Sequence, residues 1–310
     1  MLIEVTKDTY RRHFIKDISP YTSENFIKVV EKNTDKVIRL MSNNDKSIGL
    51  ILGLKDGKLS APFSAPFAGF HYTHEYLFSN VVHEFLLKLQ NYIVENDLKG
   101  VSITLPPDIY QTNMNAKLTN AFIRLGYKMS IPDIVNWIDL NKFDGTWIKN
   151  TVAQNCRKAE NYGMVFRRVT DDDVIQEVYN IILKNRVSQN RNMFMSLQDL
   201  KNNESAFPVD FFQIKDGDQN TVGGAVFYRG HEKIVQGIFV GDNMVNRSLG
   251  IMDLLYWKIF EFYKDLNYEI ADLSTSTEDG IPNNGLLRFK EIHNCAASLR
   301  YTFNWSPEEN

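Results

Sequence analysis

One order of elements, helix–strand–helix, occurs twice in this chain at a constant separation, and this repeat restricts the possible folds more than any other feature. In each copy, apolar residues at helical spacing are followed by a short β-branched segment and then by a second helical pattern. The first copy covers residues 80–98, 101–105 and 115–127, and the second covers 248–266, 268–276 and 283–293.

The two copies align without a gap. Leu86-Leu87 recur as Leu254-Leu255, and Asp97-Leu98 recur as Asp265-Leu266, each 168 residues later. An internal duplication explains this register and predicts two similar α/β lobes. The alternative is that two generic α/β segments share leucines by coincidence.

Strand-like segments precede each copy and are joined by short turns, as in antiparallel hairpins that lead into a helix. They lie at 36–42 and 47–54 in the first half and at 209–215, 221–229 and 233–241 in the second. We therefore expect an α/β (α+β) fold with two lobes, residues 1–135 and 136–310, each a mixed, mostly antiparallel sheet flanked by helices. An amphipathic helix is expected at 144–163, with Ile148, Val152, Cys156 and Ala159 facing inward.

Composition excludes several classes of protein. The formal net charge of −3 disfavours a protein that mainly binds DNA. Cys156 and Cys295 lack metal-ligand spacing and suggest reduced thiols. The N-terminus has no signal-peptide pattern, and the longest apolar run, 48–54, is too short to cross a bilayer. These features predict a cytoplasmic protein without an integral membrane segment.

The segment 236–257 carries the clearest indication of chemistry. A strand ends there, a polar turn follows, and a helix starts near Ser248 with Gly250 in its first turn. The first backbone N–H groups of a helix have no partner within the helix and carry the positive end of its dipole, so they favour anions. An ordinary helix start is the alternative interpretation.

This junction resembles the GNAT acyltransferase superfamily, whose pyrophosphate loop for coenzyme A reads Arg/Gln-x-x-Gly-x-Gly/Ala. Arg247 and Gly250 match, whereas Met252 replaces the last small residue. The resemblance implies an acyl-CoA donor bound at Arg247, Ser248 and Gly250. The equivalent positions in the first half are Ser79 and Val82, so the first lobe is expected to be degenerate and to lie on the acceptor side.

Four further segments resemble the Fem-type peptidyltransferases, which are built from two GNAT-like lobes. They are APFSAPFAG (61–69), CRKAENYGMVF (156–166), NRNMF (190–194) and GLLRFKEIHNC (285–295). The resemblance implies that Phe289 and Lys290 lie beside the reacting groups and that Arg191 binds an anionic group of the acceptor. It also implies that Phe63 and Phe67 line a groove between the lobes; an edge strand is the alternative for that segment.

Lys290 would supply positive charge to the oxyanion that forms during acyl transfer. A solvated helix lysine is the alternative, just as a surface arginine is for Arg191. No general base stands out, although Asp272 and Glu278 follow a strand of the second lobe. His71, His74 and His83 do not form a ligand set, so no metal is expected.

Together these features predict an N-acyltransferase that moves an acyl group from acyl-CoA to an amine of a sugar or peptide, such as a cell-envelope precursor. The first alternative is a peptidyltransferase that uses aminoacyl-tRNA as donor and tRNA as partner. The second is a non-catalytic binding module.

Overall fold

The computed structural model describes residues 1–74, 76–144, 150–245 and 247–309. The chain divides into two compact units. The first unit contains Met1–Ile134, Thr277–Ile281 and the segment that begins at Ser298, and the second contains Val135–Ser276 and Pro282–Ala297. The expected boundary assigns every residue after 135 to the second lobe, whereas the structure places Thr277–Ile281 and the segment from Ser298 onward in the first unit.

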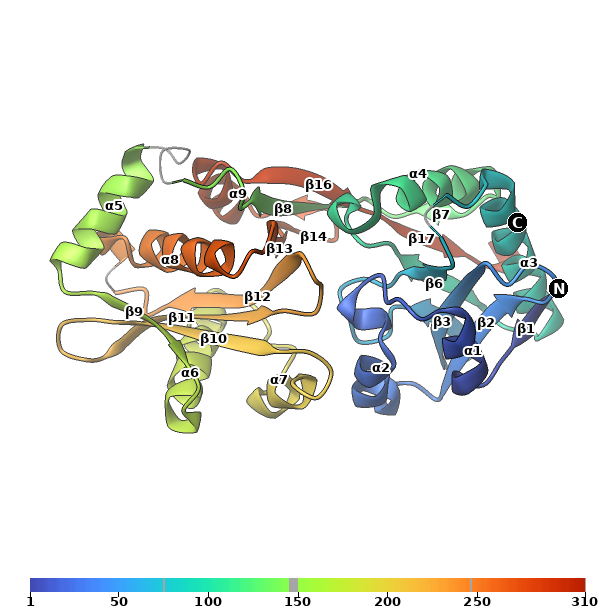
Figure 1. Cartoon of the computed structure of the whole chain (residues 1–310), viewed down its shortest axis with the longest axis horizontal. Helices are drawn as coiled ribbons and strands as arrows, with labels where there is room; N and C mark the ends of the chain where they lie inside the picture. Colours follow the sequence, from blue (N-terminus) through green and yellow to red (C-terminus); the bar gives the residue numbers. More distant parts are fainter. Residues whose placement is uncertain (75, 145–149, 246, 310) are drawn as a thin grey trace. The chain divides into compact units, whose positions relative to one another are not determined.

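The first unit is a mixed sheet with helices, shown mainly in blue and cyan in Figure 1. Its strands are β1 (Leu2–Glu4), β2 (Lys36–Ser42), β3 (Ile48–Lys55), β4 (Lys58–Ala61), β5 (Phe70–Tyr72), β6 (Gly100–Thr104), β7 (Lys128–Met129) and β17 (Thr302–Trp305). Its helices include α1 (Lys7–His13), α2 (Glu24–Val30), α3 (Ser79–Glu95) and α4 (Asp108–Arg124).

The second unit repeats this architecture. Its strands are β8 (Asp133–Asp139), β9 (Val165–Val169), β10 (Val209–Lys215), β11 (Thr221–Tyr228), β12 (Ile234–Asp242), β13 (Ile270–Thr275) and β16 (Ala296–Arg300). Its helices include α5 (Asn150–Asn161), α6 (Asp172–Ser188), α7 (Leu197–Asn203), α8 (Ile251–Asp265) and α9 (Asn284–Ile292). The short strands β14 (Thr277–Glu278) and β15 (Ile281–Pro282) pair with each other.

The two sheets share one topology. The first has the order β1-β2-β3-β4-β6-β17-β7, with the additional strand β5 paired with β3 outside this order, and the second has the order β16-β8-β13-β12-β11-β10-β9. One pair in each sheet is parallel, β4 with β6 and β12 with β13, while the neighbouring pairs on both sides are antiparallel. The prediction of two similar, mostly antiparallel sheets flanked by helices is therefore confirmed.

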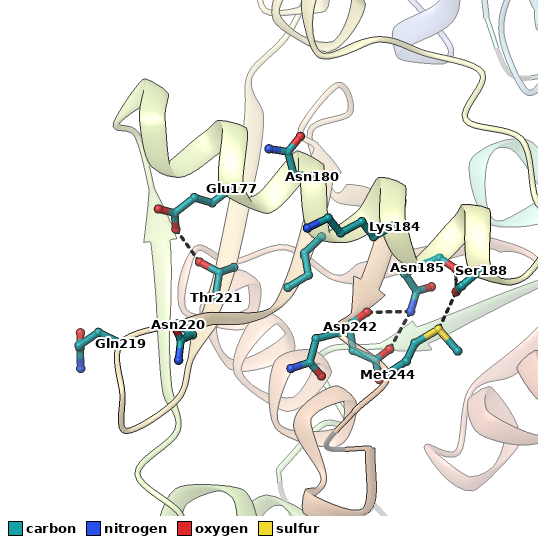
Figure 2. A pocket seen from close by; sticks show the side chains of 12 residues that line it. Glu177, Asn180, Lys184, Asn185, Ser188, Gln219, Asn220, Thr221, Asp242 and Met244 are labelled. Carbon is teal, nitrogen blue, oxygen red and sulfur yellow. Dashed lines mark hydrogen bonds between the residues drawn. The ribbon is translucent and has the colours of Figure 1, made fainter.

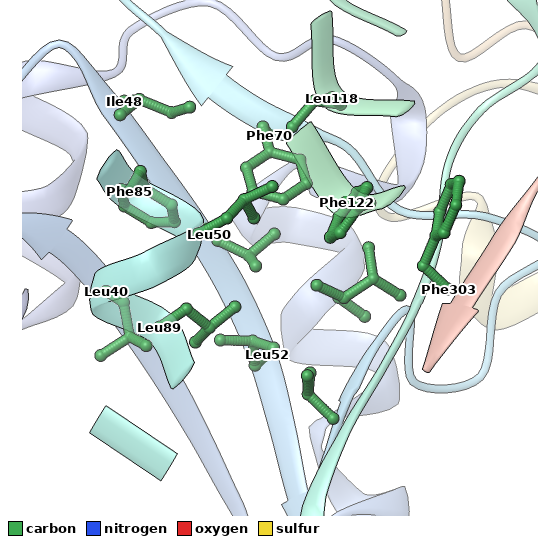
Figure 3. Packing of buried hydrophobic residues seen from close by; sticks show 14 of the residues in the cluster. Leu40, Ile48, Leu50, Leu52, Phe70, Phe85, Leu89, Leu118, Phe122 and Phe303 are labelled. Carbon is green, nitrogen blue, oxygen red and sulfur yellow. The ribbon is translucent and has the colours of Figure 1, made fainter. Parts of the chain in front are cut away.

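Each sheet also takes one strand from the other half of the chain. β17, near the C-terminus, lies between β6 and β7 of the first sheet, and β8, from the first half, lies between β13 and β16 of the second. Phe303 of β17 is fully buried, and its ring stacks on Phe122 of α4 at a centroid distance of 4.6 Å. Figure 3 shows this ring among the leucines and phenylalanines of the first core.

The periodic segments form the elements that their sequences predict. The duplicated pattern becomes α3, β6 and α4 in the first unit and α8, β13 and α9 in the second. Val152, Cys156 and Ala159 of α5 are buried as expected. Ile148 lies outside the described residues.

Helices cover both faces of the second sheet, with α6 on one face and α8 on the other (Figure 1). Consecutive residues of a strand point to opposite faces. A Cβ atom on Gly223 would meet Ile251 of α8, and one on Gly224 would meet Val178 of α6. Two neighbouring glycines thus let both helices approach β11 closely.

Candidate active site in the second unit

The central parallel strands of the second sheet are paired over only a short distance. β12 and β13 pair from Ile234 and Ile270 as far as Gln236 and Asp272, although β12 continues to Asp242. Next to this point the β11–β12 register shifts, so that Ile238 is an extra, bulged residue. Beyond Gln236, the described part of β12 therefore has no ladder partner in β13, and its Gly237 carbonyl accepts from a β13 side chain, Ser274, instead.

Lys290 of α9 lies at the end of β13. Its side chain is buried, and its Nζ donates hydrogen bonds to the backbone carbonyls of Leu273 at 2.7 Å, Ser274 at 3.0 Å and Thr275 at 3.3 Å. Ser274 has a left-handed backbone with φ of +60°, and its Oγ donates to the Gly237 carbonyl at 2.7 Å. The ammonium thus uses its three protons to hold a strained turn beside the separating strands.

Burial lowers the pKa of Lys290 to about 8. Cys295 and Asp272 act in the opposite direction, whereas Arg191 lowers the pKa further through its positive charge. Arg191 lies in the loop after α6 and is half-buried.

Asp272, one of the two acids considered as a base, is fully buried on β13. Its Oδ2 accepts a hydrogen bond from Gln236 Nε2 at 3.0 Å, and its Oδ1 accepts one from the Ser274 backbone N–H at 2.8 Å. Both oxygens are engaged in fixing the β12–β13 junction. Glu278 is exposed on β14, in a segment that belongs to the first unit.

The predicted anion-binding loop lies between β12 and α8. Arg247 and Ser248 form a short 3₁₀ turn, and Gly250 caps α8 with a left-handed backbone, φ +81°. Arg247 is half-exposed, and its Nε is 3.1 Å from Oδ2 of buried Asp242. Asn185 of α6 donates to Asp242 Oδ1 at 2.7 Å, so the aspartate is held from two sides.

Helix α5 packs directly against this loop. A Cβ atom on Gly250 would lie 2.4 Å from the backbone carbonyl oxygen of Asn155. The Asn155 side chain donates to Asp253 Oδ2 at 2.9 Å, and Lys158 Nζ donates to the Ser248 carbonyl at 2.7 Å. The loop therefore adjoins a carbonyl oxygen of α5 and a nearly buried carboxylate, both of which are unfavourable neighbours for an added phosphate.

The aromatic residues of the expected substrate site pack within their own units. Phe289 is half-buried against Tyr256 and His293 in the second unit. In the first unit, Phe67 is almost fully buried, and Phe63 has 9% of its surface exposed. The Phe67 ring contacts Tyr21 and Tyr110, at centroid distances of 5.2 and 4.9 Å.

Within the described residues, no three His, Cys, Asp or Glu side chains are grouped so that they could bind a metal ion. The same part of the chain contains no helix with both the length and the apolar character that a membrane span requires.

No protein-family model and no curated protein matches this chain. Several solved structures are similar to it. The chain is similar to FemX, with a TM-score of 0.71, 9% identity, and coverage of 100% of this chain and 98% of that one. It is also similar to the C-terminal domain of a putative lysylphosphatidylglycerol synthetase from Agrobacterium fabrum, with a TM-score of 0.63, 12% identity, and coverage of 98% and 94%.

A third similar structure is a tandem GNAT protein from the clavulanic acid biosynthesis pathway, with a TM-score of 0.56, 11% identity, and coverage of 99% and 98%. These likenesses extend over almost the full length of each chain. The chain therefore has a Fem-like fold made of two tandem GNAT-type units.

Proposed function

We propose that this protein is an acyltransferase that moves an acyl or aminoacyl group from an activated donor to an amine, and that the end of β13 in the second unit is its reaction site. The observation that carries the proposal is the buried Lys290 ammonium at the point where β12 and β13 cease to pair. Arg191, whose positive charge lowers the pKa of Lys290, would supply a second positive charge.

The chemistry needs a stabilised oxyanion. The neutral amine nitrogen attacks the donor carbonyl carbon, and the carbonyl oxygen becomes negative. As the intermediate collapses, the bond from that carbon to the donor's leaving group breaks, and the proton that the nitrogen loses is taken up by the leaving group. Backbone N–H groups of β12 beyond Gln236 are suitable donors for this oxygen. Lys290 has its three protons on carbonyls, so it acts as a positioning residue that also contributes a positive electrostatic potential.

Two donors are consistent with this site. An acyl-CoA would place its pyrophosphate at Arg247, Ser248 and Gly250, where the α8 dipole favours an anion. The Asn155 carbonyl against Gly250 and the Asp242 carboxylate on Arg247 favour the other donor, an aminoacyl-tRNA, which does not need a pyrophosphate at this loop. The proposed acceptor is an amine on a sugar or peptide, such as an envelope precursor, with its anionic group at Arg191.

Thermal unfolding with acetyl-CoA tests the first donor. A ligand that binds only the folded state raises the midpoint, because it adds about 2.7 kcal/mol at a concentration of 100 Kd. With acyl-CoA as donor, we expect a rise for the wild type that is lost in Arg247→Gln. Lys233→Gln, which changes an exposed lysine at the other end of β12, is the control and should keep the rise.

No rise with acetyl-CoA would contradict the acyl-CoA donor. Binding of an aminoacylated tRNA acceptor stem, measured next by fluorescence anisotropy, would then support the second donor. A protein that binds neither donor would contradict the transferase proposal and favour a binding module.

The pKa of Lys290 predicts opposite pH dependences for stability and for catalysis. Its folded-state pKa, about 8, lies below the ordinary value of 10.5, so between these pH values the folded protein loses a proton that the unfolded chain keeps. This group therefore makes the free energy of unfolding rise with pH in that window. The transfer rate should instead fall above pH 8, as the site loses its positive charge.

A ¹³C NMR titration of the lysine side chains checks the pKa, and a pH–rate profile checks the role of the charge. Lys290→Arg should remove the descending limb, because arginine stays protonated to a pH above about 12. A resonance that titrates near the ordinary lysine value would contradict the prediction.

A further inference from the structure

A polar pocket of about 790 Å³ lies in the second unit, between α6, the β10–β11 turn and the end of β12. Figure 2 shows α6 side chains, including Lys184 and Asn185, opposite Thr221 and Asp242 of the sheet. The volume is within the range of about 300–1,000 Å³ that is usual for small-molecule sites. The α6 side chains of this pocket belong to neither the predicted anion-binding loop nor the Lys290 site. The exception is Asn185, which donates to Asp242, the partner of Arg247.

Both carboxylates that line the pocket already have partners. Glu177 accepts hydrogen bonds from Thr221 Oγ1 at 2.6 Å and Gln213 Nε2 at 3.2 Å. Asp242 accepts from Asn185 and is paired with Arg247. Asp242 is therefore neutralised by Arg247, whereas Glu177 accepts from neutral donors and keeps its negative charge.

Lys184 is the cationic residue of the lining. Its side chain is exposed on α6, and within the described part of the chain its ammonium forms no ion pair. An ammonium with three free protons can bind one phosphate or carboxylate group.

The remaining polar lining consists mainly of side-chain amides, among them Asn180, Gln219 and Asn220. An amide offers both donors and acceptors, which is what a ring of hydroxyl groups requires. Asn220 Nδ2 and Asn180 Oδ1 each make a hydrogen bond within the protein, at 3.3 and 3.0 Å, so these amides are oriented before a ligand arrives.

We propose that this pocket binds a monosaccharide that carries a single anionic group, with the anion on Lys184 and the sugar hydroxyls on the amides of α6 and the β10–β11 turn. The proposal does not depend on the transfer reaction, since it concerns binding alone. Asp242 links this pocket to Arg247, so a bound sugar would also contact the aspartate that holds the predicted donor loop.

Isothermal titration of the full chain tests the proposal with three probes: glucose 6-phosphate, methyl glucoside and inorganic phosphate. Glucose 6-phosphate should bind most tightly. Lys184→Met should weaken it about tenfold or more, since a charge-assisted hydrogen bond is lost. Asn180→Leu should weaken both sugar probes.

Lys184 and Asn180 are exposed, so these variants should fold like the wild type. Lys233→Met, at the far end of β12, is the matched control and should leave all three affinities unchanged. The proposal fails if glucose 6-phosphate does not bind in the millimolar range, if Lys184→Met binds it as the wild type does, or if inorganic phosphate binds as tightly as the sugar phosphate.

Discussion

Lys290→Met is expected to lower the free energy of unfolding by about 3 kcal/mol and to abolish acyl transfer, because it leaves buried carbonyl groups without their donor. The carbonyls of Leu273, Ser274 and Thr275 all lose a hydrogen bond. The left-handed backbone of Ser274 is then held only from the other side, by the bond from its hydroxyl to the Gly237 carbonyl and by the bond from its N–H to Asp272. Urea unfolding measures the loss of stability, and transfer assayed at full folding measures the loss of activity.

Arg288→Met is the matched control, since Arg288 is exposed on the same helix two residues away. It should change stability by less than about 0.5 kcal/mol. If Lys290→Met were as stable and active as this control, Lys290 would be neither a positioning residue nor a source of useful charge.

The elements that could be predicted from the sequence are those whose pattern lies entirely within their own residues. In α3 and α8, apolar side chains recur at helical spacing and face the core of their own unit, so a local pattern is sufficient. β6 and β13 are short and flanked by polar or turn residues, which also marks them locally.

Helix α6 has a local signal in the sequence, although it is not among the predicted helices. Asp171 caps its N-terminus, and Ile175, Val178 and Ile182 recur on its buried face. Because this helix was missed, Lys184 and the polar pocket were missed with it. The exchange of β8 and β17 between the two sheets has no local signal at all, since β17 pairs with β6 some 200 residues earlier, for instance Thr302 with Thr104.

The candidate site, too, could be predicted from the sequence only in part. The positions of Lys290 and Arg247 at the ends of elements follow from the local pattern, but their partners do not. The Leu273 carbonyl that accepts from Lys290, the Asp242 that pairs with Arg247 and the Asn155 carbonyl that meets Gly250 all depend on tertiary packing. A sequence motif therefore indicates where a donor would bind without showing what already occupies the space.

Gly250→Ala is the second substitution with a large expected effect. The residue needs a φ of +81°, which costs a non-glycine residue about 1–2 kcal/mol. The new methyl group would also lie 2.4 Å from the Asn155 backbone carbonyl, so α5 would have to shift. We expect a total loss of about 3 kcal/mol or more, with the α5 amides exchanging faster in hydrogen-exchange measurements.

Gly285→Ala separates this effect from a general sensitivity to alanine. Gly285 is helical in α9, and its nearest neighbour would be an ordinary 3.6 Å from the new Cβ, so this change should stabilise the protein by about 0.4–1 kcal/mol. If Gly250→Ala unfolded at the wild-type denaturant concentration with unchanged exchange in α5, the close packing of α5 on the loop would be refuted. The structural argument against a pyrophosphate at this loop would then fail, and acyl-CoA would become the favoured donor.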